Sequence, residues 1–271
     1  MTTSPAQRYP TAELFDAAIF DLDGTLLDSL RDLAETANAC LAARRLPLLP
    51  LTCYRDLVGS GIPELCRRML AMSRWVAAAG GLPDDRLFDA ETGLIRPAVL
   101  AVVRSGQPET GADPPSASDL TRLIDDFSEH YDAHWQDHTR PFDGVLDLLA
   151  VLRGRGIRLA LFSNKADLFV RAISDRYFGS GLFDIVIGQK PDQPLKPSPA
   201  VPLAIAAAWQ IPPACVCMVG DSDVDMATAR AAGMYPVAVS WGFRSRDELI
   251  RAGAGMMAER PSDLLQLFME D

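Results

Sequence analysis

The stretch FDLDGTLLDS, residues 20–29, places two aspartates one residue apart directly after an apolar run. Residues 17–20 have the sequence AAIF, which is typical of a buried strand. A carboxylate at the end of such a strand is costly unless a positive group compensates it. A divalent cation that takes oxygen ligands is the simplest partner for Asp21 and Asp23.

The bulk composition excludes some partners of the chain. The chain has 271 residues and a formal net charge of −10, which argues against binding a nucleic-acid backbone. A small phosphorylated metabolite is still compatible, because a bound metal can reverse the local charge. The first 14 residues contain no apolar segment of the kind found in secretion signals, and no apolar run approaches the ~18 residues of a membrane span. We therefore expect a cytoplasmic protein without a membrane or nucleic-acid partner.

Five short apolar runs predict a parallel sheet. They lie at 17–24, 157–165, 183–188, 215–221 and 236–242. Near-continuous apolar runs indicate strands that are buried on both faces, and helical patterns separate the last four of them. The predicted fold class is therefore α/β, with a doubly wound, mainly parallel, Rossmann-like sheet.

More than a hundred residues separate the first two runs, too many for one crossover. Amphipathic patterns at 29–45, 62–80 and 119–135 predict that this insertion is a helical cap domain, with Ser29 as the N-cap of its first helix. We assign 1–27 and 141–271 to the core and 28–140 to the cap. The cap includes an extended insertion near 72–118, which contains a Pro- and Gly-rich loop at 106–118.

Distinctive polar residues follow three of the predicted strands and one loop. The carboxyl ends of parallel strands meet at one edge of a sheet, so these residues should lie together. Three carboxylates there suit Mg²⁺, while a hydroxyl and a lysine suit a phosphoryl group. The candidate residues are Asp21 and Asp23, Ser163 and Asn164, Lys196, and Asp221 and Asp225.

The segments DLDGT, SNK, KPSP and GDSDVDMATARAAG resemble, in this order, the four motifs of the haloacid dehalogenase (HAD) superfamily of phosphatases. The residues around them resemble the phosphoglycolate phosphatase-like branch. This resemblance implies Mg²⁺-dependent hydrolysis of a small phosphomonoester through an aspartyl-phosphate, with 2-phosphoglycolate as the best single candidate. No individual motif would be specific, but four in the right order are.

The resemblance also implies roles for the residues around the first aspartates. Asp21 would be the nucleophile and Asp23 the general acid and base. Thr25 would help to orient Asp23. Mg²⁺ would be held by Asp21, the Asp23 carbonyl and Asp221.

The remaining motif residues would bind or orient the phosphoryl group. Ser163 and the backbone of Asn164 would contact phosphoryl oxygens, and Lys196 would balance the charge on Asp21 and phosphate. Asp225 would orient a metal-bound water or Lys196. For Asp223, a simple preference for a helix N-terminus is the better interpretation.

The cap should determine the substrate. The stretch VGSGIPEL, residues 58–65, resembles the cap loop that faces the active site, and its amides at Ser60, Gly61 and Ile62 could contact an anionic leaving group. We expect Arg67 and Arg68 to be solvated or paired. The long insertion leaves the substrate and the oligomeric state open.

Other functions remain possible at this stage. One is a phosphosugar mutase of the β-phosphoglucomutase kind, although the residues after the first motif lack the cap His or Lys that it would need. Others are a pyrophosphate or nucleotide phosphatase and a non-catalytic phosphoaspartate switch. The three histidines, His130, His134 and His138, have the spacing of one helix face, which allows a zinc site, but packing or hinge contacts are favoured.

Overall fold

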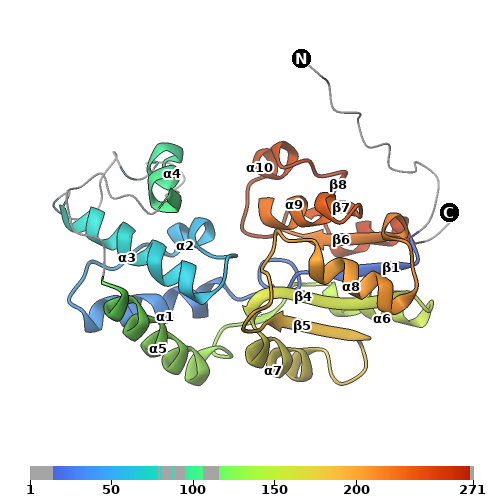
Figure 1. The fold of residues 1–271 in the computed structure, drawn as a ribbon, viewed down its shortest axis with the longest axis horizontal. Coiled ribbons are helices and arrows are strands. Elements are labelled where there is room, and N and C mark those ends of the chain that lie inside the picture. The colour runs from blue at the N-terminus through green and yellow to red at the C-terminus, as the bar shows by residue number, and fades with distance from the viewer. Residues whose placement is uncertain are drawn as a thin grey trace, which may run out of the picture.

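The computed structural model describes residues 15–78, 80, 87, 89, 95–105 and 116–268. The core contains a six-stranded sheet in the order β5-β4-β1-β6-β7-β8, and every pairing is parallel. The predicted α/β fold class with a helical cap is confirmed (Figure 1). The strands are β1 (Ala17–Phe20), β4 (Arg158–Ala166), β5 (Ile185–Gln189), β6 (Val216–Gly220), β7 (Tyr235–Val239) and β8 (Met256–Ala258).

The central strand β1 explains where the first motif lies. All four of its residues are fully buried, because β4 and β6 flank it and helices cover both faces. The strand ends at Phe20, so Asp21 is the first residue beyond it. The prediction omitted β8, whose three residues are too short to stand out as an apolar run.

Two layers of helices cover the sheet. Apolar residues of α6 (Val145–Gly154) and α7 (Asp167–Tyr177) pack on one face, and those of α8 (Ala200–Trp209) and α9 (Asp223–Ala231) pack on the other. Helix α10 (Arg246–Arg251) packs beside α9. Short 3₁₀ turns lie at η1 (Pro213–Cys215) and η2 (Pro261–Leu267).

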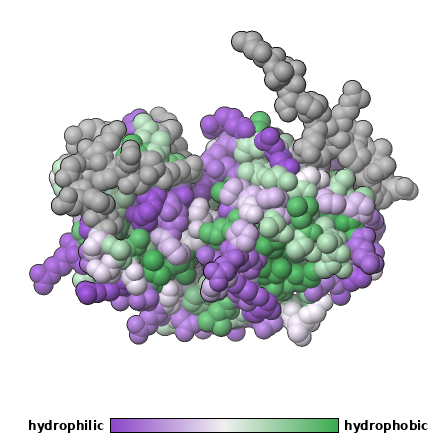
Figure 2. Space-filling view, in the orientation of Figure 1, coloured by the Kyte–Doolittle hydropathy of each residue, from purple (hydrophilic) through white to green (hydrophobic). Residues whose placement is uncertain are grey.

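Helix α8 is apolar on its outer side as well. Its sequence is AVPLAIAAAW, and Leu203 is 39% exposed. Figure 2 shows hydrophobic residues gathered over this part of the core. The inner side of α8 packs on the sheet through Val201, Ile205 and Ala206.

The cap consists of α1 (Leu30–Ala43), α2 (Leu51–Leu57), α3 (Ile62–Ala78), α4 (Pro97–Ser105) and α5 (Ala117–His134). Helix α5 packs on α1 and α3, and α4 packs on α3 (Figure 1). The three predicted cap helices correspond to α1, α3 and α5. Residues 106–115 of the loop predicted at 106–118 lie outside the described residues. So do most residues of the 72–118 insertion between the end of α3 and residue 95. No helix of the described chain is long and apolar enough to cross a membrane.

Two short strands, β2 (Leu27–Asp28) and β3 (Arg140–Pro141), pair antiparallel where the chain passes between core and cap. Beside them, the buried Asp32 carboxylate accepts hydrogen bonds from the backbone amides of His138 and Thr139, from the Thr139 hydroxyl and from the His138 ring. The start of α1 is thereby tied to the strand that returns to the core. Asp32 thus joins the two segments of chain that connect core and cap.

The histidines contact three different partners. His130 lies 3.2 Å from Thr36 Oγ1, His134 lies 2.9 Å from Asp137, and His138 lies 2.9 Å from Asp32. Helix α5 ends at His134, so His138 is not on the same helix face. The rings of His130 and His134 contact each other, with centroids 4.5 Å apart, while His138 belongs to the linker beside Asp32.

We expect Asp32→Asn to destabilise the protein by ~1–3 kcal/mol, because an amide cannot accept from all these donors. Burial alone would raise the pKa of Asp32, but the donors of Thr139 and His138 outweigh it and lower the pKa. The stabilisation is therefore present above the ordinary carboxylate pKa and is lost as the pH falls through the lowered value. Urea unfolding at pH 7 measures the effect. The control is Glu35→Gln on the same helix, at an exposed position, which should change little.

Candidate active site

Asp21 and Lys196 form the centre of the site. Lys196 Nζ lies 2.7 Å from Asp21 Oδ1 and 2.9 Å from Asp225 Oδ1. The Lys196 side chain is only 2% exposed. Burial would lower the pKa of Lys196, but the two carboxylates outweigh it and raise the pKa, so the side chain is a firmly charged ammonium.

Asp221 completes a cluster of three buried carboxylates. One oxygen from each of Asp21, Asp221 and Asp225 lies within 4.8 Å of the others. Burial, with help from the neighbouring negative charges, raises the pKa of Asp221 to about 7. Burial also raises the pKa of Asp21 to about 6, although Lys196 opposes the shift. Keeping Asp21 and Asp221 ionised in the folded protein therefore costs free energy.

The donor set fits a divalent cation. Lys196 contacts two of the three carboxylates, Asp21 and Asp225, so the buried cluster keeps a net negative charge. Hard cations such as Mg²⁺ take carboxylate and carbonyl oxygens of this kind. Asp225 is already engaged by Lys196 and by the amide and hydroxyl of Ser222, so Asp21 and Asp221 are the better candidates for direct ligands.

Two glycines allow the loops to close on Asp221. A Cβ at Gly24 or at Gly242 would overlap the Asp221 side chain, and Gly24 also has a φ of +85°. The amide of Phe243 donates to Asp221 Oδ2 at 2.8 Å. The contacts of Gly24 and Gly242 with Asp221 could not be predicted from the motif around Asp221, because both glycines lie in other loops.

Thr25 is a correction to the sequence prediction. Its hydroxyl donates to Asp221 Oδ1 at 3.2 Å, not to Asp23, and Thr25 is 1% exposed. The turn after Asp23 points the hydroxyl back toward β6, where Asp221 follows the strand. Thr25 therefore supports a candidate metal ligand and offers no surface to a substrate.

Asp23 is held by two partners that the sequence did not indicate. Lys165 Nζ lies 3.0 and 2.8 Å from its two carboxylate oxygens, and the Ser29 hydroxyl donates to Oδ1 at 2.5 Å. Ser29 occupies the predicted N-cap position of α1, but its hydroxyl donates to Asp23 and makes no capping hydrogen bond.

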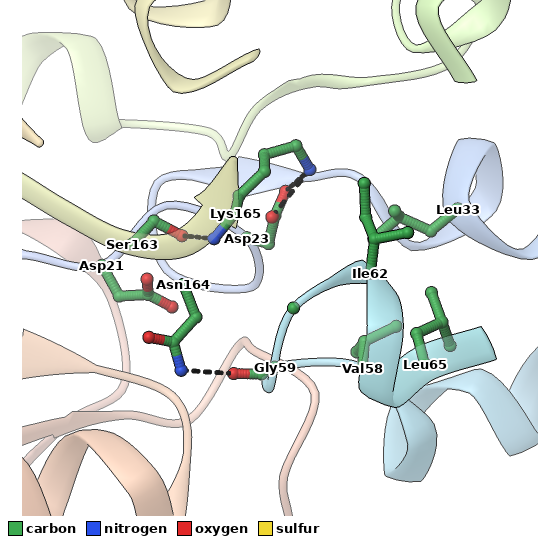
Figure 3. A pocket seen from close by; sticks show the side chains of 11 residues that line it. Asp21, Asp23, Leu33, Val58, Gly59, Ile62, Leu65, Ser163, Asn164 and Lys165 are labelled. Carbon is green, nitrogen blue, oxygen red and sulfur yellow. Dashed lines mark hydrogen bonds and ion pairs between the residues drawn. The ribbon is translucent and has the colours of Figure 1, made fainter. Parts of the chain in front are cut away.

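Ser163 and Asn164 lie in β4, near its carboxyl end, and line the same pocket (Figure 3). The Asn164 side chain accepts from the Lys196 amide at 2.9 Å and donates to the Gly59 carbonyl at 3.3 Å. This side chain therefore organises the loops on both sides of the pocket. The expected contacts of Ser163 and of the Asn164 backbone with phosphoryl oxygens stay predictions.

The pocket between core and cap is small and has two unlike walls. Figure 3 shows Asp21, Asp23, Ser163 and Asn164 on the core side and apolar side chains on the cap side. Its volume is about 40 Å³, roughly three times what one water needs. The apolar residues are Leu33, Val58, Ile62 and Leu65.

Gly61 lines this pocket and touches the core. It has a φ of +85°, and a Cβ there would lie 3.1 Å from Gln189 Oε1 and 3.2 Å from the Asn164 carbonyl. Arg67 and Arg68, one to two turns further on, are both paired with Glu64, in agreement with the prediction for these arginines.

We expect Gly61→Ala to lower kcat/KM several-fold for every phosphomonoester, because the strained loop can no longer seat against Asn164. Steady-state assays on a natural substrate and on an aryl phosphate measure the effect. Gly80→Ala, also at positive φ but with open space around its Cβ position, is the control for strain away from the pocket. A loss confined to one substrate would contradict this interpretation.

Two arginines join the cap to the core beside Asp221. Arg55 on α2 donates to the carbonyls of Phe243 and Gly242, at 3.1 and 2.8 Å. In return, Arg244 donates to the carbonyls of Arg55 and Val58. We call these two side chains the arginine latch. The stretch WGFRS contains Arg244, but nothing in it indicates a partner almost two hundred residues away.

A family model for haloacid dehalogenase-like hydrolases matches residues 15–233, which span both cap and core. The chain belongs to the haloacid dehalogenase-like hydrolases. This HAD chain has the motif residues of the family in one place, so the predicted membership is confirmed.

Relatives of this HAD chain cover nearly its whole length. A phosphoglycolate phosphatase of Chromobacterium violaceum is 29% identical over 93% of this chain and 95% of its own. The phosphoglycolate phosphatase of Escherichia coli K12 is 28% identical over 91% and 89%.

Solved structures agree with the fold. A provisionally named phosphoglycolate phosphatase from Lactobacillus delbrueckii subsp. bulgaricus has a TM-score of 0.76 and 28% identity, covering 96% of this chain and all of the other. CbbY from Rhodobacter sphaeroides, solved with phosphate, has a TM-score of 0.63 and 19% identity, covering 94% and 99%. The second likeness concerns the fold alone.

Proposed function

We propose that this hydrolase is a Mg²⁺-dependent phosphatase that acts on a small phosphomonoester through a phosphoaspartate on Asp21, with 2-phosphoglycolate as its substrate. The observation that carries the proposal is the Asp21 carboxylate, held by Lys196 at 2.7 Å in the pocket that Asp23 and Ser163 also line. A nucleophile, a fixed cation and an acid–base group are thus together.

The first step forms a bond between an Asp21 oxygen and phosphorus and breaks the ester bond. The leaving oxygen takes a proton from Asp23. In the second step Asp23 takes a proton from water, whose oxygen bonds to phosphorus as the bond to Asp21 breaks. General acid–base catalysis of the kind that Asp23 would perform contributes ~10²–10⁴-fold. Lys196 and Ser163 bind the phosphoryl oxygens in both steps.

Asp21, Asp221 and the Asp23 carbonyl would hold Mg²⁺, with Asp225 orienting Lys196. When bound, the cation supplies positive charge against the phosphoryl oxygens. Thr25 and the Phe243 amide keep Asp221 in position for this task.

The relatives and the pocket support a small substrate. The curated relatives at 28–29% identity are named phosphoglycolate phosphatases. The pocket of about 40 Å³ suits a two-carbon leaving group better than a hexose or a nucleoside. This favours 2-phosphoglycolate over the sugar phosphates of a mutase and over nucleotides.

A phosphate-release assay with Mg²⁺ tests the proposal. The panel contains 2-phosphoglycolate, pyrophosphate, a nucleoside monophosphate, and β-glucose 1-phosphate, for which isomerisation is also followed. We expect the highest kcat/KM for 2-phosphoglycolate. A preference for pyrophosphate or the nucleotide, or conversion of glucose 1-phosphate without release, would contradict it.

A further inference from the structure

Lys165 is a buried ammonium at the boundary between the two walls of the pocket. Its side chain is 5% exposed and its Nζ contacts both oxygens of Asp23. The Tyr131 ring lies 4.7 Å from Nζ and supports it from the cap. Figure 3 shows the side chain extending past Ser163 and Asp23 toward Leu33 and Ile62.

Lys165 is the positively charged side chain of a pocket whose other lining residues are acidic, polar or apolar. Among the eleven described residues that line the pocket, Lys165 is the one cation. The opposite wall is apolar, and Arg67 and Arg68 nearby are occupied by Glu64. An anionic group on the far side of a substrate would therefore meet only one matching side chain in this lining.

The contacts of Asp23 also indicate that Lys165 changes its partner during the reaction. Lys165 reaches both of its oxygens, and Ser29 also donates to Oδ1. A leaving oxygen must come within hydrogen-bond distance of one of these oxygens to receive a proton. As the carboxylate partner of an ammonium, Asp23 has no proton to give, so the ion pair has to loosen before Asp23 can act as the acid.

We propose that Lys165 is a specificity-determining residue that binds the carboxylate of the substrate's leaving group and, by this exchange of partners, releases Asp23 to the leaving oxygen. The proposal rests on the proposed phosphatase function and deepens it. A substrate carboxylate replaces Asp23 on Lys165, so the buried ammonium stays paired. The displaced Asp23 carboxylate takes a proton from solvent and then gives this proton to the leaving oxygen.

A neutral leaving group offers no such exchange. It would either leave the Lys165–Asp23 pair intact or separate it without compensation, and an unpaired buried charge is costly. Substrates with an acidic leaving group are therefore preferred, even though most of the cap wall is apolar.

The test compares 2-phosphoglycolate with glycolamide phosphate, in which an amide of nearly the same shape replaces the carboxylate. We expect wild-type kcat/KM to favour 2-phosphoglycolate by ~10²-fold, because the pocket's charged group is left unmatched by the amide. Lys165→Met should reduce this preference to about one, with the larger loss on 2-phosphoglycolate. Lys190→Met, which removes an exposed lysine 3.7 Å from Asp167, should leave the preference unchanged.

A second measurement separates recognition from positioning and from folding. In an Asp21→Asn background, calorimetry measures binding of both compounds with and without Lys165→Met, and thermal unfolding checks that each variant is folded. We expect Lys165→Met to weaken 2-phosphoglycolate selectively. If Lys165→Met is not folded, the same titration with Lys165→Arg, which keeps the charge, should retain the preference.

Equal losses on both compounds, or a wild-type preference near one, would overturn the proposal and leave Lys165 as a positioning residue for Asp23. Failure of the proposed function would look different. In that case no phosphomonoester of the panel would release phosphate, while the binding comparison would still decide whether Lys165 recognises the carboxylate.

Discussion

Asp21→Asn is expected to reduce phosphate release by at least ~10³-fold, to the background of the assay, because the amide lacks the charge that attacks phosphorus. The fold should survive, since Asn keeps the size of the side chain and Lys196 can still contact its carbonyl oxygen. Steady-state turnover of the best substrate measures the loss. Thermal unfolding verifies the fold.

Asp28→Asn is the matched control for this variant. Asp28 lies in the same motif segment but is exposed, so its substitution should leave turnover within about two-fold of wild type. If Asp21→Asn retained a tenth of wild-type turnover, a phosphoaspartate on Asp21 would be ruled out.

Removal of the cation should have the second largest effect. Chelation is expected to abolish turnover and Mg²⁺ to restore it. Asp221→Ala should weaken Mg²⁺ binding by at least ~10²-fold, because a buried ligand is lost. Asp223→Ala removes a half-exposed carboxylate in the first turn of α9 and should have little effect. Equal effects in a calorimetric titration would overturn the ligand assignment.

The pH dependence of this binding follows from the same carboxylates. Burial raises the pKa of Asp221 to about 7 and that of Asp21 to about 6. Without the cation, the folded chain binds protons more tightly than the unfolded chain, so these groups lower stability as the pH rises from about 4 through 7. Mg²⁺ requires the ionised forms, so we expect it to raise the melting temperature more at pH 8 than at pH 6. A larger rise at pH 6 would contradict the argument.

Short-range patterns were enough to predict the sheet and the motif residues at its edge. The buried run before Asp21 and the apolar run before Asp221 each mark a strand, and parallel strands must deliver their carboxyl ends together. The β8 strand was missed because three residues carry no periodic signal.

The contacts of individual side chains were harder to predict. The Lys165–Asp23 pair joins residues 142 positions apart, and either side chain could have been solvated. Thr25 and Ser29 each have a local role that the sequence favours, but the turn aims one hydroxyl at Asp221 and the other at Asp23. Tertiary geometry selected the acceptor of the Thr25 hydroxyl, and it made the Ser29 hydroxyl a donor to Asp23 where a cap would accept from a helix amide.

The arginine latch makes residues 242–244 part of two equilibria. Arg55 of the cap holds the carbonyls of this segment, while the Phe243 amide holds Asp221. Suppose that lifting the cap weakens the amide contact by some free energy. By thermodynamic reciprocity, a cation bound to Asp221 then favours the seated cap by the same amount. A change confined to the cap surface could thus alter cation affinity without touching any carboxylate.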